Sequence, residues 1–326
     1  MRAFFYSSLR IDMSDVWTQY WRQGHPTTFG AYFDNGYTGA VADFITEGLS
    51  SNNPSSMLLT EFCCGNGASL APLAGLNHPI EYTGIDLAQV KISRDTASLC
   101  KDSGIEVTMV PNTGVENTPL KDNSQDVVIS IYGIEYSDIQ TSIAEARRVL
   151  IDGGRLRALM HHCESSVAKM SRRALNEFHS DDITRVTQNL ATINDALNRL
   201  DSPQQLKLDP EAEVARSKIN GLCNKYLGDT NPVTGNAFMI DHMSGALRFF
   251  QMLGQPKDVR SRFIDDLELE SRSSRERHQQ MVDVAYDEAS ISALAATMMD
   301  KGWCSVDFES YKDNEGVIGW SLTAVS

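Results

Sequence analysis

The chain has 326 residues, 41% of them hydrophobic and 22% charged, and a net charge of −14 at pH 7. These fractions are typical of a globular protein and exclude a disordered one, and the length suffices for one large domain or two ordinary ones. An acidic surface repels phosphate backbones, so we expect no nucleic acid partner.

Export and membrane insertion are also disfavoured. No run of about 18 apolar residues occurs, and the apolar patch within residues 1–15 is too short for the core of a signal peptide. The six cysteines include no C-x-x-C pair, so we expect reduced thiols. These features predict a cytoplasmic protein with no membrane partner.

The first segment with a clear pattern is residues 15–33, which is dense in aromatic side chains. Val16 and Tyr20 stand at helical spacing, and this spacing predicts an amphipathic helix that packs on the rest of the fold. We interpret residues 1–56 as an N-terminal helical cap.

Residues 57–163 alternate between strand-like and helix-like segments. The strand-like segments are 57–62, 81–87, 105–110, 125–134 and 155–162, and the helix-like ones are 68–76, 88–103 and 139–150. Asp138 is expected to cap the last helix, and the Asp-Gly-Gly turn at 152–154 is expected to end it. This alternation predicts a mostly parallel sheet with helices on both faces and a ligand at the carboxyl edge of the strands.

Beyond residue 163 the helical period dominates. One predicted helix face carries six apolar residues: Ile183, Val186, Leu190, Ile193, Leu197 and Leu200. Shorter patterns follow at Val214, Ile219, Leu222 and Tyr226, and within residues 235–254. We interpret residues 164–300 as a large helical insertion after the fifth strand, whose apolar faces pack on one another rather than on a coiled-coil partner. The insertion fits either a lid or a homodimer interface.

The chain ends with two strand-like segments, 303–311 and 317–325, which flank a hairpin loop. We expect them to complete the sheet as residues 301–326. The predicted fold is therefore α/β and Rossmann-like: a mostly parallel seven-stranded sheet with an antiparallel last strand, helices on both faces, and the helical insertion after strand five.

The chemistry centres on the stretch LLTEFCCGNGAS at residues 58–69, where an apolar strand runs into two glycines and then a helix. Gly65 and Gly67 allow a ligand to approach the backbone, and Asp86, 19 residues further on, can accept hydrogen bonds from a ribose diol. Dinucleotide binding needs a third glycine where Leu70 stands, so a nicotinamide-dependent oxidoreductase is disfavoured.

Several motifs resemble the class I S-adenosylmethionine-dependent methyltransferase family. EFCCGNGA resembles the first family motif and YTGIDLA resembles the second, whose acid binds the ribose hydroxyls. ENTPLKDNSQDVVIS and RRVLIDGGRLRAL resemble the later motifs, and the terminal hairpin resembles the reversed last strands of the family. The resemblance covers residues 55–160 and 303–325, and it implies S-adenosylmethionine as the cofactor.

The resemblance also implies which residues bind the cofactor. They are Glu61, Cys63, Gly65, Gly67, Asp86, Leu87, Glu116, Asn117 and Ser130, with Tyr20 and Trp21 as cover from the N-terminal helix. For Trp17 we favour simple packing. Two positions depart from the family: Cys63 replaces a glycine, and Gly114 replaces the acid that usually recognises adenine, so Glu116, Asn117 or a backbone carbonyl must do so.

The methyl acceptor is expected beside the ends of the fourth and fifth strands. Tyr132 and Glu135 follow the fourth strand, and Glu135 serves either as a base or as a helix N-terminal charge. His161 and His162 end the fifth strand, and because neighbours on a strand point to opposite faces, at most one faces the ligand. Two such neighbours cannot chelate one ion, so we predict no metal site.

These residues predict an enzyme that methylates a small molecule at oxygen, nitrogen or sulfur. Two alternatives remain open. One is a protein methyltransferase whose helical insertion recognises its partner. The other is a non-catalytic cofactor-binding scaffold, which the departures at Cys63 and Gly114 would favour.

Overall fold

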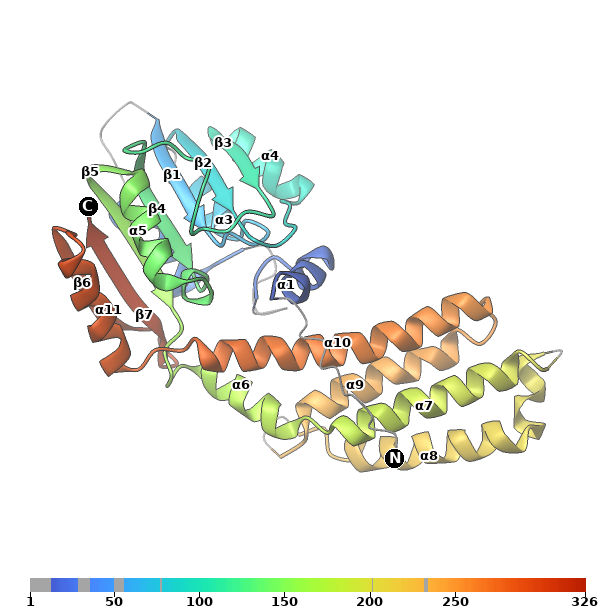
Figure 1. Ribbon diagram of the computed structural model, residues 1–326. Helices are drawn as coiled ribbons and strands as arrows, with labels where there is room; N and C mark the ends of the chain where they lie inside the picture. Colours follow the sequence, from blue (N-terminus) through green and yellow to red (C-terminus); the bar gives the residue numbers. More distant parts are fainter. Residues whose placement is uncertain (1–12, 29–35, 50–55, 77, 201, 232–233) are drawn as a thin grey trace, which may run out of the picture. The chain divides into compact units, whose positions relative to one another are not determined.

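The computed structural model describes residues 13–28, 36–49, 56–76, 78–200, 202–231 and 234–326 (Figure 1). The chain divides into two compact units, one made of Met1–Lys169 with Gln280–Ser326 and the other of Met170–Gln279. The first, here called the sheet unit, contains every strand of the described residues, and the second, the helical unit, is built of helices.

The sheet unit contains the predicted seven-stranded sheet. Its strands are β1 (Met57–Phe62), β2 (Ile80–Ile85), β3 (Ile105–Val110), β4 (Gln125–Ile131), β5 (Leu150–Met160), β6 (Ser305–Lys312) and β7 (Val317–Val325). They lie in the order β3-β2-β1-β4-β5-β7-β6, and β7 runs antiparallel to both of its neighbours. The predicted fold class is therefore confirmed, including the reversed last strand.

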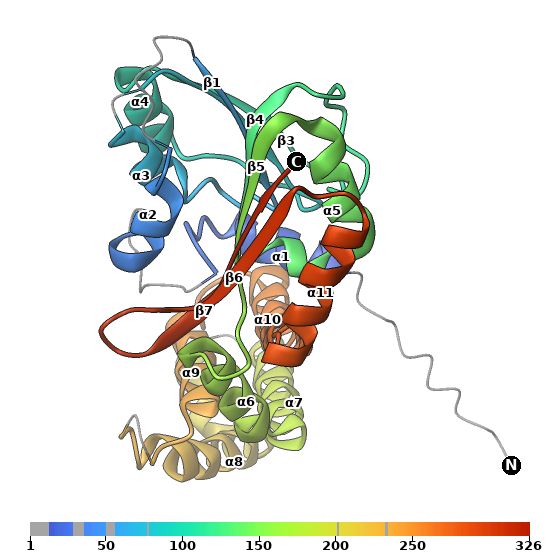
Figure 2. The same ribbon diagram turned by 90° about the vertical axis from the view of Figure 1, so that its left-hand side faces the viewer.

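Helices cover both faces of this sheet, as Figure 2 shows. On one face, α2 (Gly39–Thr46), α3 (Leu70–Ala74) and α4 (Arg94–Asp102) pack on the first strands. On the other, α5 (Ile139–Val149) and α11 (Glu288–Asp300) pack on β4, β5 and β7. β4 is buried along nearly its whole length, which explains its near-continuous apolar run.

The helix expected at residues 88–103 is shorter than predicted. It begins at Arg94, where the Ser93 hydroxyl accepts a hydrogen bond from the N–H of Thr96 at 3.0 Å and so caps the first turn. Residues 88–92 instead belong to the loop beside the cleft, because the N–H of Ala88 is committed to the Asp86 carboxylate.

The Asp-Gly-Gly segment at residues 152–154 was predicted as a turn, and it lies within β5 instead. α5 ends at Val149 and the strand follows directly. Asp138 caps α5 as predicted, since its carboxylate accepts a hydrogen bond from the N–H of Thr141 at 3.2 Å. The glycines are absorbed by a register shift between β4 and β5, which removes the need for a separate turn.

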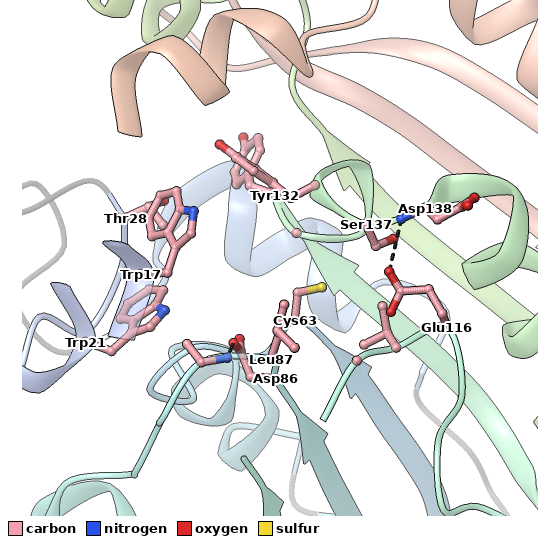
Figure 3. Close-up of a pocket in the computed structure, with 15 residues that line it drawn as sticks. Trp17, Trp21, Thr28, Cys63, Asp86, Leu87, Glu116, Tyr132, Ser137 and Asp138 are labelled. Atoms are coloured by element: carbon pink, nitrogen blue, oxygen red, sulfur yellow. Dashed lines mark hydrogen bonds between the residues drawn. The ribbon is translucent and has the colours of Figure 1, made fainter. Parts of the chain in front are cut away.

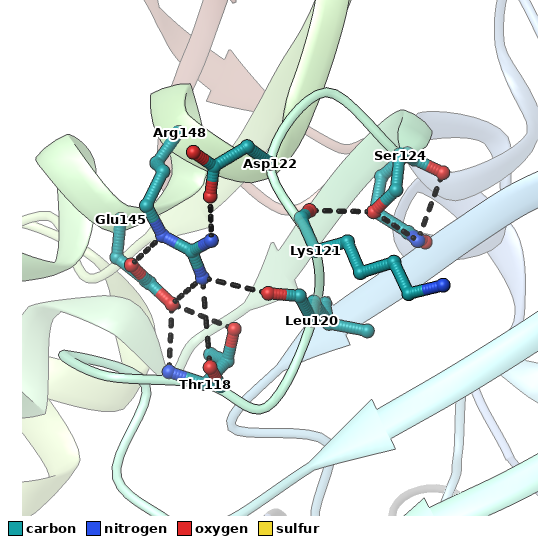
Figure 4. Close-up of polar contacts among 8 residues, drawn as sticks. Thr118, Leu120, Lys121, Asp122, Ser124, Glu145 and Arg148 are labelled. Atoms are coloured by element: carbon teal, nitrogen blue, oxygen red, sulfur yellow. Dashed lines mark hydrogen bonds and ion pairs between the residues drawn. The ribbon is translucent and has the colours of Figure 1, made fainter.

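A polar network fixes the loop that precedes β4 (Figure 4). The Glu145 carboxylate accepts hydrogen bonds from the N–H and hydroxyl of Thr118 at 2.6 and 2.7 Å, and from Arg148 Nε at 2.7 Å. Arg148 also pairs with Asp122. Burial would raise the pKa of Glu145, but the hydrogen bonds from Arg148 and Thr118 outweigh it and lower the pKa. The network anchors the chain just after residues 114–116.

The helical unit holds most of α6 (Ser166–Glu177) and α10 (Lys257–Asp283), with α7 (Ser180–Leu197), α8 (Pro210–Leu227) and α9 (Ala237–Leu247) between them. Short 3-10 helices lie at Pro203–Leu208 and Arg248–Gln251. The apolar stripe predicted from Ile183 to Leu197 is buried in the core of the unit, although Leu200 follows the end of α7. The second stripe is less regular, since Val214 is 56% exposed.

The helical unit ends earlier than the predicted boundary at residue 300. Residues 280–300 belong to the sheet unit, because Ile291, Leu294 and Met298 of α11 are buried against the sheet. Helical periodicity alone does not distinguish a helix of the insertion from a helix that covers the sheet. No helix among the described residues is both long and apolar enough to cross a bilayer.

Candidate active site

A cleft lies at the carboxyl ends of β1, β2 and β4, where the parallel sheet was expected to bind its ligand (Figure 3). Its walls are mainly apolar and aromatic, with three carboxylates among them. The lining residues are Trp17, Trp21, Thr28, Cys63, Asp86, Leu87, Ala88, Gly114, Val115, Glu116, Tyr132, Gly133, Tyr136, Ser137 and Asp138.

Asp86 joins the glycine loop to the next strand. One carboxylate oxygen accepts a hydrogen bond from the N–H of Gly65 and the other from the N–H of Ala88, both at 2.8 Å. Each oxygen keeps a further lone pair, so the carboxylate can also accept bonds from a ligand in the cleft. Burial raises the pKa of Asp86 to about 6, against the opposing effect of the two backbone hydrogen bonds.

The two glycines of the loop adopt backbone conformations that side chains rarely take. Gly65 has a φ of 52° and Gly67 a φ of 79°. A Cβ on Gly65 would lie 2.7 Å from the Trp21 ring, and one on Gly67 would lie 2.9 Å from Leu70. Leu70 thus fills the space that a third glycine would leave open.

Two residues other than glycine adopt the left-handed conformation at the cleft. Cys63 has a φ of 58° and Tyr132 a φ of 53°. Such a conformation costs about 1–2 kcal/mol for a residue with a Cβ. Cys63 therefore adopts a conformation that glycine adopts without this cost, and Gly133 packs so closely that a Cβ there would lie 2.5 Å from Cys63 Cβ.

Two residues predicted to bind the cofactor do not line the cleft and instead form hydrogen bonds with neighbouring protein groups. Glu61 accepts hydrogen bonds from the hydroxyls of Tyr82 at 2.5 Å and Ser69 at 2.7 Å. Ser130 is fully buried, donates to the Phe62 carbonyl at 2.8 Å and accepts from the N–H of Ile134 at 2.9 Å. Neither residue lines the cleft, so the structure does not bring Glu61 and Ser130 together with Asp86 there.

Glu116 and Asn117 were expected to recognise adenine in place of the family acid that Gly114 replaces. Glu116 lines the cleft and Asn117 does not. Glu116 accepts a hydrogen bond from the N–H of Asp138 at 3.0 Å, which places its carboxylate between two loops of the cleft. Asn117 is exposed outside it. Leu87 lines the cleft as predicted and is 48% exposed, so an apolar surface faces the opening.

Helix α1 (Met13–Arg22) contributes two tryptophans to the cleft. Trp17 and Trp21 are stacked, with ring centroids 6.2 Å apart, and both line the cleft (Figure 3). The predicted cover residue Tyr20 does not line it and donates its hydroxyl to the Thr27 carbonyl at 2.8 Å. Trp17, for which simple packing was favoured, thus both packs on Trp21 and lines the cleft; its spacing of four residues from Trp21 on one helix face is the signal that could have revealed the second contact.

Aromatic side chains also form the opposite wall. Tyr132 stacks on His161 with ring centroids 4.9 Å apart, and the Tyr136 hydroxyl lies 3.1 Å from His161 Nε2. Tyr136, which was not among the predicted catalytic residues, meets Trp17 edge to face at 5.6 Å. Burial lowers the pKa of His161 to about 3, so its ring is neutral.

Glu135 lies on the other side of the short helix η2 (Ile134–Tyr136), where it lines a separate cavity of the sheet unit together with Tyr286. One carboxylate oxygen accepts a hydrogen bond from the N–H of His161 at 2.8 Å, and the other is buried without a partner among the described residues. Burial raises the pKa of Glu135 to about 7. Glu135 is therefore close to the cleft without lining it.

The two neighbouring histidines point in different directions, as alternation along a strand predicted. His162 stacks on Trp320 with ring centroids 4.4 Å apart, away from the tyrosines that flank His161. Its Nδ1 accepts a hydrogen bond from the N–H of Glu164 at 2.9 Å. The structure thus removes His162 from the site, and the described residues contain no cluster of three potential metal ligands.

Comparisons with known proteins find matches for part of the chain. Residues 60–158 match the family model described as a methyltransferase domain. Phthiotriol/phenolphthiotriol dimycocerosates methyltransferases are similar: the protein of Mycobacterium tuberculosis is 34% identical over 99 residues, or 29% of this chain and 34% of that protein. The protein of Mycobacterium leprae is 35% identical over 107 residues, 32% of this chain and 37% of that protein. The chain thus spans about a third of the length of these relatives.

Solved structures similar to this chain include several methyltransferases. A possible histamine N-methyltransferase from Thermotoga maritima has 18% identity and a TM-score of 0.33, covering 51% of this chain and 70% of its own. Geranyl diphosphate C-methyltransferase from Streptomyces coelicolor has 19% identity and a TM-score of 0.29, and the match covers 37% of this chain and 45% of that one. The CMeT domain of the citrinin polyketide synthase has 13% identity and a TM-score of 0.36, and the match covers 84% of this chain and 47% of that one.

Residues 60–158 are a methyltransferase domain, and S-adenosylmethionine is its cofactor. The residues of the cleft fit this cofactor. Asp86 retains free lone pairs for two ribose hydroxyls, and Glu116 offers an acceptor to an adenine amine. When bound, S-adenosylmethionine supplies an activated methyl group.

Proposed function

We propose that the protein transfers a methyl group from S-adenosylmethionine to a small-molecule acceptor. The observation that carries the proposal is Asp86, held by Gly65 and Ala88 at the carboxyl end of β2 inside a domain that matches methyltransferases. The relatives match only part of this chain, so the acceptor class is inferred from the lining of the cleft alone.

A small acceptor is favoured by the walls of the cleft. The aromatic rings of Trp17, Trp21, Tyr132 and Tyr136 line it from two sides, and apolar walls exclude water from the reacting groups. A narrow aromatic site suits a compact, partly apolar molecule better than a folded protein surface. Alignment of such an acceptor supplies most of the rate increase that a displacement at an activated methyl group requires.

The acceptor-side residues divide into two roles in this proposal. Tyr136, whose hydroxyl lies 3.1 Å from His161 Nε2, orients the acceptor through a hydrogen bond. Glu135 does not line the cleft; it accepts a hydrogen bond from the N–H of His161 at 2.8 Å and so positions the wall on which Tyr136 lies. The neutral His161 is a weak base, since burial lowers its pKa to about 3.

The first experiment is calorimetric titration of the whole chain with S-adenosylmethionine and S-adenosylhomocysteine, with NAD as a control. We expect both sulfur compounds to bind and NAD not to bind. Transfer of a labelled methyl group is then measured with a pool of small metabolites and, separately, with a pool of proteins. Labelling of proteins alone would replace this proposal with a protein methyltransferase, and failure to bind either sulfur compound would favour the scaffold.

A further inference from the structure

The helical unit contains a cavity of its own, about 750 Å³ in volume. It lies among α6, α9 and α10, which are labelled in Figure 1, and every residue that lines it falls within Met170–Gln279. A cavity of this size is large enough for a small organic molecule. Its lining combines the rings of Phe238 and Phe263 with histidines and charged side chains.

His242 lines this cavity and is 5% exposed. Its Nδ1 lies 2.7 Å from the hydroxyl of Ser271, which donates its only hydrogen to the Leu267 carbonyl at 3.1 Å. Nδ1 must then be the donor, and Nε2 carries a lone pair. Burial lowers the pKa of His242 to about 4, so the ring is neutral.

The Nε2 atom of His242 is buried and has no hydrogen-bond partner among the described residues. An unsatisfied buried acceptor destabilises a fold, so such a group usually has a reason. A ligand that donates a hydrogen bond would satisfy it. The same described residues contain no cluster of three potential metal ligands, which disfavours a metal ion as that ligand.

Four carboxylates line the cavity, and two of them are already committed. Glu177 pairs with Arg173, and Glu270 pairs with Arg277. The other two, Asp241 and Asp266, make no hydrogen bond or ion pair with any described residue. Arg248 also lines the cavity and likewise makes no hydrogen bond or ion pair with a described residue. Burial raises the pKa of Asp241, as expected for a carboxylate that lacks a compensating cation.

We propose that this cavity binds an organic ammonium ion with an aromatic or alkyl body. The uncommitted carboxylates Asp241 and Asp266 attract the positive charge, Phe238 and Phe263 contact the apolar body, and a hydrogen on the ligand reaches His242 Nε2. The proposal concerns the helical unit by itself and does not depend on methyl transfer.

The test is calorimetric titration of the whole chain with three probes of similar size: 2-phenylethylamine, which is protonated at pH 7, 2-phenylethanol and phenylacetate. We expect the amine to bind at least tenfold more tightly than the alcohol and phenylacetate to bind most weakly. Equal affinity for the amine and the alcohol, or no binding of the amine, would overturn the proposal.

Three variants then place the binding in the cavity. His242→Phe keeps the shape of the ring and removes the unsatisfied acceptor, so we expect a higher Tm together with a loss of amine affinity of about tenfold. Asp241→Asn should weaken the amine by a similar factor and leave 2-phenylethanol unchanged. Asp195→Asn removes the same charge from an exposed position of α7 and should change neither. Wild-type amine affinity in both cavity variants would show that the amine binds elsewhere and would overturn the proposal.

Discussion

The two sides of the cleft differ in how their polar groups are satisfied. On the side of β1 and β2, the carboxylates of Glu61 and Asp86 each accept two hydrogen bonds from the protein. On the side of β4 and β5, one oxygen of Glu135 and Nδ1 of His161 are buried without a partner among the described residues. The cofactor side is therefore complete before any ligand binds, and the acceptor side is not.

The difference bears on the two parts of the proposed reaction. A carboxylate held by backbone N–H groups keeps its geometry, so under the proposed function Asp86 binds the ribose without rearrangement. The buried atoms of Glu135 and His161 that lack partners leave hydrogen-bonding capacity on the acceptor side. Variants on the first side should therefore change cofactor affinity, and variants on the second side should change turnover.

The largest expected effect is at Asp86. Asp86→Ala removes the acceptor for the ribose hydroxyls and frees the N–H groups of Gly65 and Ala88, so we expect S-adenosylmethionine to bind about a hundredfold more weakly. Asp138→Ala is the matched control, because Asp138 also lines the cleft but caps α5. Calorimetry measures both. Equal losses in the two variants would contradict a specific role for Asp86.

A tenfold effect is expected at Tyr136. Tyr136→Phe removes the hydroxyl that lies 3.1 Å from His161 Nε2 and keeps the ring against Trp17. Loss of one oriented hydrogen bond should lower kcat/KM about tenfold, with the cofactor Kd unchanged. Steady-state kinetics with the identified acceptor checks this. A weakened cofactor and an unchanged kcat would instead place Tyr136 on the cofactor side.

A smaller effect is expected in stability at Cys63, which has a φ of 58°. Cys63→Gly and Cys63→Ala both remove the sulfur, but only alanine keeps the Cβ that disfavours this conformation. We expect the glycine variant to be more stable than the alanine variant by about 1 kcal/mol. Denaturant unfolding of the two variants measures the difference. Greater stability of the alanine variant would mean that the loop is not left-handed in solution.

The smallest effect is the pH dependence of cofactor binding. Burial raises the pKa of Asp86 to about 6, and the ionised carboxylate is the form that accepts two hydroxyl donors. Affinity should therefore fall as the pH falls through 6, by about fourfold between pH 7 and pH 5.5. Asp86→Asn should bind weakly at both pH values. The same dependence in that variant would assign the titration to another group.

Much of the fold could be predicted because its signals are local. The apolar runs at residues 57–62, 105–110 and 317–325 are β1, β3 and β7, with the predicted bounds. Gly65 and Asp86 were recognisable because the turn after β1 and the end of β2 restrict which residue types can stand there. Local backbone requirements restrict the residue types at such positions, whatever the rest of the molecule is.

The directions of side chains past the strand ends were decided by the tertiary structure. Tyr132 has a φ of 53°, and the turn that follows sends Tyr136 into the cleft and Glu135 to the other side of η2. Ser130 and Glu61 stand at positions that suit a ligand, but buried neighbours occupy their hydrogen bonds. A periodic pattern assigns a face only within a regular helix or strand, whereas past its end each side chain follows one backbone conformation and the contacts that hold it.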